Sequence, residues 1–192
     1  MFQCSITTQH LLIIFYEGRN FEGRSHEVTS DQPDMHSHLS RCNSIRVESG
    51  CWMIYERSNY LGHQYFLKRG SYPDYQQWMG FNDSIRSYHH CCAPVSLHCH
   101  HYIYISKIQI YEKTDFGGRM MELMHDCSSI SEEFRHGDIQ SCQVIEGSWI
   151  FYEQPNYRGR QYLLRPGEYR RFTEWGAMTS RVGSLRRVVD SY

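Results

Sequence analysis

Large apolar residues recur with a spacing of two just ahead of four Tyr-Glu pairs in the chain. Residues at this spacing lie on one face of an extended strand, because successive side chains of a strand point to opposite faces. The pattern therefore predicts four strands that each turn one face into a core, with the Tyr on the outward face. The apolar pairs are Ile13 and Phe15, Trp52 and Ile54, Ile108 and Ile110, and Trp149 and Phe151.

Each predicted strand leads into the same motif, Tyr-Glu-x-x-x-aromatic-x-Gly, which begins at Tyr16, Tyr55, Tyr111 and Tyr152. The residues between the Glu and the aromatic are polar and rich in turn formers, so each copy predicts a hairpin. The Gly two residues after the aromatic predicts either a positive φ or a ring packed directly against the backbone. In the fourth copy, Tyr152 and Gly159 are predicted to clamp the hairpin.

Each unit continues through a second strand and a loop to a closing strand that contains a serine. Four short strands in a unit of ~40 residues, without a helical period, predict an antiparallel β-sandwich. The serine hydroxyl is predicted to bond backbone groups of the folded hairpin. The serines assigned to this place are Ser44, Ser84, Ser141 and Ser184.

The four units alternate in type. The second and fourth units each contain two Trp residues at the same separation, whereas the first and third lack Trp and predict short helical turns near 35–39 and 130–134. The period of organisation is therefore a pair of units, so we expect two similar domains whose boundary lies between Arg86 and Lys107. The Trp pairs are Trp52 and Trp78, and Trp149 and Trp175.

Composition and charge narrow the class of protein. Hydrophobic residues make up 40% of the 192 residues, which is enough for a core and too much for a disordered chain. The formal net charge is -1, so we expect no general attraction to nucleic acid or to an anionic membrane. The eight cysteines show no disulfide framework, and the first residues show no signal peptide. We therefore expect a reducing cytosolic setting with mostly free thiols.

The chain resembles the βγ-crystallin superfamily, and within it the vertebrate gamma-crystallins most closely. The four hairpin motifs, the closing serines and the paired Trp residues carry the resemblance, together with two long segments. These run from Arg41 to Ser87 and from Gly147 to Val188. The resemblance implies an all-β fold of two antiparallel β-sandwich domains, each made of two Greek-key motifs. The predicted division is an arm at 1–10, a domain at 11–87, a linker at 88–106 and a domain at 107–192.

The resemblance also implies a function. Such a protein is a structural constituent of the eye lens, a soluble monomer of high refractive index in the cytoplasm of lens fibre cells. We expect it to associate weakly with its own copies and with other lens crystallins. We expect no nucleic-acid or membrane partner, no cofactor and no metal. The composition fits this role, because aromatic rings, sulfur and guanidinium groups are polarisable and the chain has 15 Tyr, 9 Phe, 4 Trp, 8 Met and 8 Cys.

The family's domains meet through apolar residues of their second units, and these positions are Met53, Phe66, Ile150, Leu163 and Val188. Strand parity supports two of them independently. Met53 and Ile150 lie on the outward face of strands whose inner face already holds Trp. An apolar outward face needs a partner surface.

Two segments depart from the family: the arm at 1–10 and the long linker at 88–106, for which we consider retained intron sequence as a hypothesis. The linker leaves a transition-metal site open as an alternative function, since Cys and His are ligands for zinc and copper. Its spacing is too crowded for one tetrahedral site. The residues concerned are His89, His90, Cys91, Cys92, His98, Cys99, His100 and His101.

A calcium-binding module is the other alternative, but none of the segments ahead of the closing serines begins with the acidic or amide pair that such modules use. Catalytic motifs for acyl or phosphoryl transfer and for metalloproteases are absent from the sequence, so we expect no enzyme. Cys42 and Cys51 lie in or beside predicted strands and are expected to be small buried residues.

Overall fold

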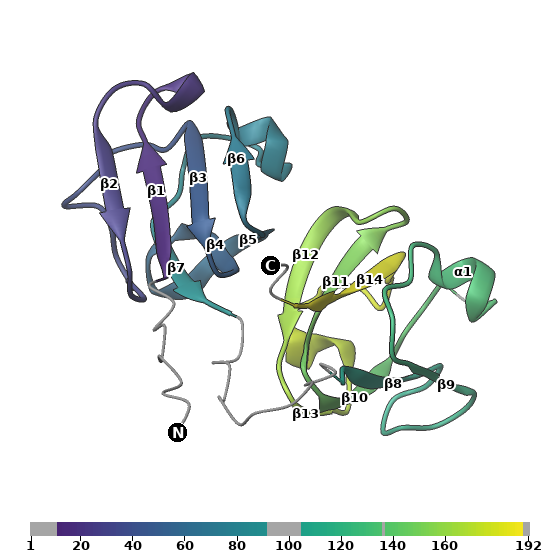
Figure 1. Cartoon of the computed structure of the whole chain (residues 1–192). Helices are drawn as coiled ribbons and strands as arrows, with labels where there is room; N and C mark the ends of the chain where they lie inside the picture. The colour runs from purple at the N-terminus through teal and green to yellow at the C-terminus, as the bar shows by residue number, and fades with distance from the viewer. Residues whose placement is uncertain (1–10, 92–104, 136, 190–192) are drawn as a thin grey trace, which may run out of the picture.

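The structure is a computed structural model that describes residues 11–91, 105–135 and 137–189. In the first half of the chain, antiparallel strands form two sheets (Figure 1). The first sheet has the order β2-β1-β3-β6 and the second the order β5-β4-β7. Their bounds are β1 (Leu12–Tyr16), β2 (Ser25–Val28), β3 (Ser44–Ser49), β4 (Trp52–Arg57), β5 (Leu61–Leu67), β6 (Gly70–Tyr72) and β7 (Ser87–His90).

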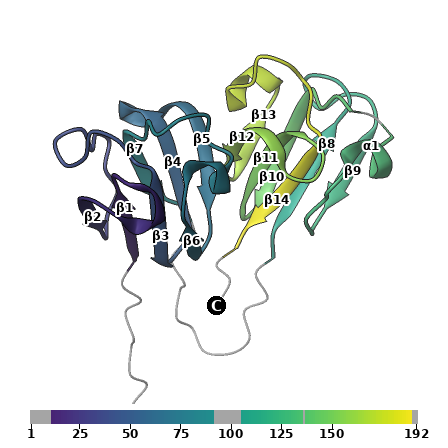
Figure 2. The ribbon, with the colours of Figure 1, turned by 90° about the horizontal axis from the view of Figure 1, so that it is seen from above.

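The second half repeats this arrangement, with sheets of order β13-β10-β8-β9 and β12-β11-β14. The chain therefore forms two antiparallel β-sandwiches that stand side by side (Figure 2), and the all-β prediction is confirmed. The strands are β8 (Lys107–Tyr111), β9 (Met120–Leu123), β10 (Ser141–Glu146), β11 (Ser148–Gln154), β12 (Arg158–Leu164), β13 (Gly167–Tyr169) and β14 (Ser184–Val188).

The two units of each sandwich exchange segments. Strand β6 follows β5 in sequence but pairs with β3 of the first unit, and β13 pairs in the same way with β10. In return, Gln32 of the first unit forms a bridge to Tyr88 in β7, and Cys127 forms one to Leu185 in β14. Each sheet thus contains backbone from both units, which makes the pair, rather than the single unit, the smallest complete sandwich.

The predicted inward residues form the cores. Ile13, Phe15, Trp52 and Ile54 are fully buried in the first sandwich, and their counterparts on β8 and β11 are fully buried in the second. The helical turns were also predicted correctly. The Leu39 N–H donates to the Met35 carbonyl, and α1 (Ile130–Glu133) lies where the second turn was expected. Within the described residues, 3₁₀ turns complete the elements: η1 (Arg19–Phe21), η2 (Ser58–Tyr60), η3 (Tyr75–Trp78) and η4 (Phe172–Trp175).

Each hairpin folds back through two consecutive non-glycine residues in the left-handed region, followed by a glycine with positive φ. In the fourth unit Asn156 has φ 59°, Tyr157 has φ 60° and Gly159 has φ 82°. The Tyr152 ring packs against the Tyr157 ring, with ring centroids 5.7 Å apart. The atoms nearest to Gly159 belong instead to Glu153 and Gln154, so the clamp between Tyr152 and Gly159 stays a prediction. Left-handed non-glycine residues are strained and persist only where surrounding contacts hold them.

A buried serine holds the strained hairpin. In the fourth unit the Tyr157 N–H donates to Ser184 Oγ at 2.9 Å, and the Ser184 hydroxyl donates to the Gln154 carbonyl at 2.7 Å. Ser44 and Ser141 make the equivalent pair of bonds in the first and third units. The Ser prediction is therefore confirmed for these three units.

The serine assignment for the second unit was wrong. Ser87, not Ser84, accepts from the Tyr60 N–H at 3.0 Å and donates to the Arg57 carbonyl at 2.6 Å. Ser84 lies ahead of β7 and donates to the Glu56 carbonyl at 3.2 Å. The signal was present in the sequence, because Ser87 follows Trp78 by the same nine residues that separate Ser184 from Trp175.

Strand β7 also takes in residues that were placed in the linker. Tyr88, His89 and His90 pair with β4. They do so because a closing strand that begins at Ser87 needs several residues to cover β4. Tyr88 then enters the core and stacks on Phe15, with ring centroids 4.8 Å apart.

We expect Ser87→Ala to lower the free energy of unfolding by about 1–3 kcal/mol, because it removes one buried donor and one buried acceptor of the hairpin. Ser84→Ala is the matched control and should cost less, since Ser84 makes a single side-chain bond at a half-exposed position. Urea unfolding followed by Trp fluorescence measures both. An equal loss in the two variants would contradict the assignment to Ser87.

Candidate functional site between the two domains

An apolar cluster joins residues of both sandwiches, where β5 and β12 lie close together (Figure 2). The structure brings all five residues predicted for an interdomain contact into this cluster: Met53, Phe66, Ile150 and Val188 are buried in it, and Leu163 is partly buried against it. It also contains residues that were not predicted. These are Cys51, Tyr55, Cys91, Tyr152 and, partly buried, Tyr157.

Strand register explains why these residues meet. Met53 on β4 pairs with Phe66 on β5, and Ile150 on β11 pairs with Leu163 on β12. Both pairs lie on the face that points away from their own core, as the parity of the Trp residues required. Met53 and Ile150 are nevertheless fully buried, because the other sandwich covers them. The outward Tyr55 and Tyr152 are buried for the same reason. Their burial could have been predicted from the sequence, because they share the outward strand face with Met53 and Ile150.

Two glutamines bond across the contact in a symmetric manner. The Phe66 N–H donates to Gln161 Oε1 at 2.9 Å, and the Leu163 N–H donates to Gln64 Oε1 at 3.1 Å. Gln64 and Gln161 occupy equivalent places in units two and four. Each side chain therefore satisfies an edge-strand amide of the opposite sandwich, which fixes the register of the contact in addition to the apolar burial.

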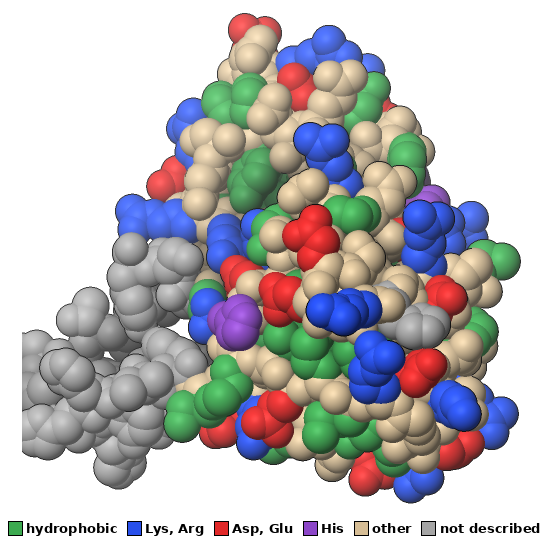
Figure 3. Space-filling model, turned by 90° about the vertical axis from the view of Figure 1, so that its right-hand side faces the viewer, with side chains coloured by type: hydrophobic (Ala, Val, Ile, Leu, Met, Phe, Trp, Pro, Cys, Tyr) green, Lys and Arg blue, Asp and Glu red, His purple; other side chains and the backbone are tan. Residues whose placement is uncertain are grey.

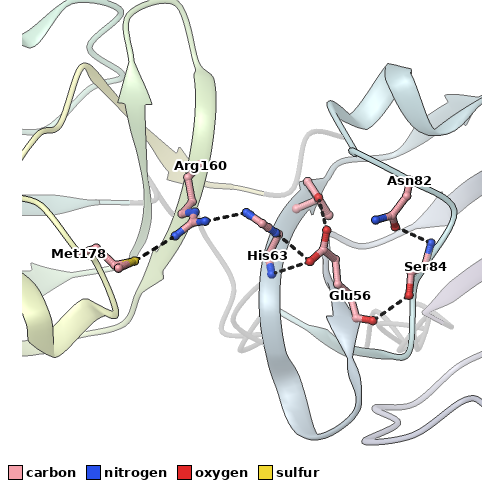
Figure 4. A network of polar contacts seen from close by, with 7 residues as sticks. Glu56, His63, Asn82, Ser84, Arg160 and Met178 are labelled. Atoms are coloured by element: carbon pink, nitrogen blue, oxygen red, sulfur yellow. Dashed lines mark hydrogen bonds and ion pairs between the residues drawn. The ribbon is translucent and has the colours of Figure 1, made fainter.

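Two histidines of the first sandwich face arginines of the second at the edges of the cluster. Figure 4 shows the first, where Arg160 donates to His63 Nε2 at 2.8 Å. At the second, Arg165 Nη2 lies 3.5 Å from His89 Nδ1. His89 is itself buried, and this burial lowers its pKa, with the Arg165 charge acting in the same direction.

The polar atoms of His89 are engaged within the chain. Its Nε2 lies 2.9 Å from the Tyr55 hydroxyl, and its Nδ1 donates to the His90 carbonyl at 3.0 Å. Within the described residues, no group of three or more His, Cys, Asp or Glu side chains is arranged to hold a metal ion. Five residues of the transition-metal alternative lie outside the described residues: Cys92, His98, Cys99, His100 and His101.

The loops considered for calcium use their oxygens for internal bonds. Asn82 Oδ1 accepts from the Ser84 N–H at 2.8 Å, and Asp138 Oδ1 accepts from the Ser180 hydroxyl at 3.3 Å. A hollow lies beside the fourth hairpin, but arginines contribute to its wall, which disfavours a cation. Its lining residues are Glu153, Gln154, Pro155, Asn156, Arg158, Thr179 and Arg181.

Among the described cysteines, Cys42, Cys127 and Cys142 are buried thiols. Burial raises the pKa of the Cys127 thiol to about 12, with a smaller contribution from Glu133. Cys91 is also a buried thiol, so most of the described cysteines are thiols as expected, whereas Cys51, buried as expected, is disulfide-bonded.

The family model described as "Beta/Gamma crystallin" matches residues 12–90 and 107–188, which are the two sandwiches. The chain belongs to the beta/gamma crystallin family. It is 61% identical over 180 residues to gamma-crystallin B of Homo sapiens, covering 94% of this chain and 98% of the relative. Gamma-crystallin 2 of Rana temporaria is 59% identical over 176 residues, with 92% and 99% covered. Gamma-crystallin M2 of Chiloscyllium indicum is 56% identical over 180 residues, with 94% and 98% covered.

This similarity to vertebrate gamma-crystallins supports a structural role as an eye-lens crystallin. The relatives are structural proteins rather than enzymes. Within the described residues, no helix has the length and apolar character needed to span a bilayer.

We expect Ile150→Ala to lower the free energy of unfolding by about 2–4 kcal/mol, because the truncated side chain leaves a cavity between the sandwiches. Ile145→Ala is the matched control. Ile145 is 42% exposed, so its loss should cost less than about 0.5 kcal/mol. Urea unfolding of both variants measures the difference, and equal stabilities would contradict the importance of the contact.

Alkylation should distinguish the native protein from the unfolded chain. Cys42, Cys127 and Cys142 should resist iodoacetamide at neutral pH, because the reactive species is the thiolate and burial disfavours it at each site. Peptide mass spectrometry with and without denaturant measures the modification. Rapid labelling of these cysteines in the native protein would show that the cores open readily.

Proposed function

We propose that this crystallin acts as a monomer in the cytoplasm of lens fibre cells, where dense packing raises the refractive index and the medium remains transparent. Its contacts with its own copies and with other lens crystallins are weak. The two sandwiches act as paired domains, and Met53, Phe66, Ile150, Leu163 and Val188 form the contact between them.

The burial of two outward apolar faces against each other within one chain carries this proposal. Large apolar patches on a free surface favour association with other molecules. Here the apolar outward faces of β4 and β11 are covered by the opposite sandwich, so they offer no docking surface to a second copy. The geometry therefore supports a two-domain monomer.

The remaining surface supports weak rather than strong association. Lys and Arg side chains are interspersed with Asp and Glu on the face in Figure 3, and the net charge is only -1. A protein of low net charge is not held apart by long-range repulsion, so its copies approach closely at high concentration. This property suits a dense medium, provided that no strong specific contact forms.

Polarisable groups are packed together in the hairpins. The guanidinium carbon of Arg186 lies 3.9 Å from the centroid of the Tyr157 ring, and that of Arg46 lies 4.3 Å from the Phe21 ring. Guanidinium groups stack readily on aromatic rings, which orders both side chains on the surface. At these positions the chain keeps polarisable groups at its surface and covers the aromatic ring with a charged group.

A concentration series tests the proposed role. We expect the full chain, purified under reducing conditions, to show a high refractive increment and light scattering that stays close to that of a monomer as the concentration rises. Strong scattering or a dimer at low concentration would contradict the monomeric medium. Calcium and zinc titrations form the second arm: a stoichiometric binding heat with a raised melting temperature would favour a metal-binding module instead.

A further inference from the structure

His63 in the first sandwich bonds the guanidinium of Arg160 in the second. Among the described residues, no other histidine ring lies within 3 Å of a guanidinium across the two sandwiches. Its Nδ1 lies 2.7 Å from Glu56 Oε2, and its Nε2 lies 2.8 Å from Arg160 Nη2 (Figure 4). His63 and Arg160 occupy equivalent positions, each seven residues after the Glu of its hairpin motif. The contact therefore joins two related positions of the two domains.

The partners of His63 fix its protonation state. A carboxylate only accepts hydrogen bonds, so Nδ1 must carry the proton that it donates to Glu56. A guanidinium only donates, so Nε2 must present its lone pair to Arg160. The contact between domains therefore requires a neutral imidazole with its single proton on Nδ1.

We propose that His63 makes the contact between the two domains sensitive to protons, so that acid weakens the contact. A proton on Nε2 would point at Arg160 and place two cations against each other across the domain boundary. One of them must then turn away.

The sign of the pH dependence follows from this arrangement. The docked arrangement excludes a proton that the separated arrangement binds, so docking releases a proton. The contribution of His63 to docking is therefore complete at high pH. Once the released imidazole is protonated, the equilibrium constant for docking falls by up to roughly tenfold for each pH unit. Histidine is the side chain whose charge ordinarily changes within the range of about pH 5 to about pH 8, so the test compares about pH 7.5 with about pH 5.5.

The other groups around His63 do not titrate in this range. Burial acts to raise the pKa of Glu56, but the bonds from the His63 ring and backbone outweigh it and leave that pKa lowered. Tyr65 donates its hydroxyl to Glu56 Oε1 at 3.1 Å, and burial raises its pKa. Arg160 remains charged, and Phe81 contributes only an apolar ring, 4.9 Å from His63 between centroids.

His89, on the opposite edge of the contact, is the second titratable ring that faces an arginine. Its Nδ1 donates to its own strand's carbonyl, and its Nε2 meets the Tyr55 hydroxyl. Burial lowers the pKa of His89, so it resists protonation to lower pH than an ordinary histidine. The proton response near neutral pH is therefore assigned to His63.

Two backbone amides report the contact directly, because the Phe66 and Leu163 N–H groups donate to glutamines of the opposite domain. We expect their hydrogen-exchange protection factors in the full chain to fall roughly tenfold or more between about pH 7.5 and about pH 5.5. The amide of Ile54, in the centre of β4, should keep its protection. Protection at Phe66 and Leu163 that does not change with pH would overturn the inference.

His63→Gln supplies the variant. A glutamine amide accepts from Arg160 and donates to Glu56 without titrating, so both amides should stay protected throughout the range. His125→Gln is the matched control, since His125 is exposed, pairs with Glu133 at 3.9 Å and lies in the second sandwich away from the cluster. It should keep the wild-type response. An acid loss in His63→Gln equal to that of the wild type would overturn the assignment.

A measurement on the unmodified chain keeps the inference testable if the variant does not fold. Nitrogen NMR of His63 at about pH 7.5 should show a neutral ring protonated on Nδ1, and a proton on Nε2 would overturn the inference. The inference rests on the domain contact proposed above. Unprotected Phe66 and Leu163 amides at every pH would defeat that contact as well, whereas protected amides without a pH response would defeat this inference alone.

Discussion

The folded hairpin is the constraint on which the rest of the molecule depends. Each copy places two consecutive non-glycine residues in the left-handed region, a strain of about 1–3 kcal/mol per residue. A buried serine from the closing strand offsets this strain by bonding the hairpin backbone on both sides, as Ser184 does for Tyr157 and Gln154. The hairpin therefore cannot hold its shape until a strand far along the chain has closed over it. Local and long-range structure form together.

The units of each sandwich, and the two sandwiches, also depend on segments that are distant in sequence. Strand β6 completes the sheet of the first unit, and the Gln32–Tyr88 bridge returns the connection, so neither unit is complete alone. The two sandwiches then cover each other's outward apolar faces, and Gln64 and Gln161 each bond a backbone amide across the boundary. The outward faces of β5 and β12 therefore each carry an apolar residue that packs at the domain contact and a glutamine that bonds the opposite domain.

The fourfold repetition of the motif allowed most of the fold to be predicted from the sequence. It also led to the wrong assignment of one closing serine. The period-two apolar pairs located the core strands, because their spacing follows from local geometry. Of the two explanations predicted for the motif Gly, the positive φ holds in all four copies. The assignment of the closing serine of the second unit to Ser84 was nevertheless wrong. Closing strands begin at other distances from the hairpin in the first and third units. Alignment of the second unit with the fourth, through the motif Tyr or through Trp78 and Trp175, selects Ser87.

The sequence by itself determined the strand faces, the hairpins, the pairing of units and the outward apolar positions Met53 and Ile150, because each depends on local periodicity or on repetition. Phe66, Leu163 and Val188 followed only from the resemblance to the family. The tertiary structure decided which polar groups meet across that contact. His63 and Arg160 lie far apart in sequence, and nothing in either neighbourhood indicates that one ring nitrogen must accept from a guanidinium of the other domain. Their bond exists because two folded hairpins present equivalent positions to each other, which only the relative placement of the sandwiches provides.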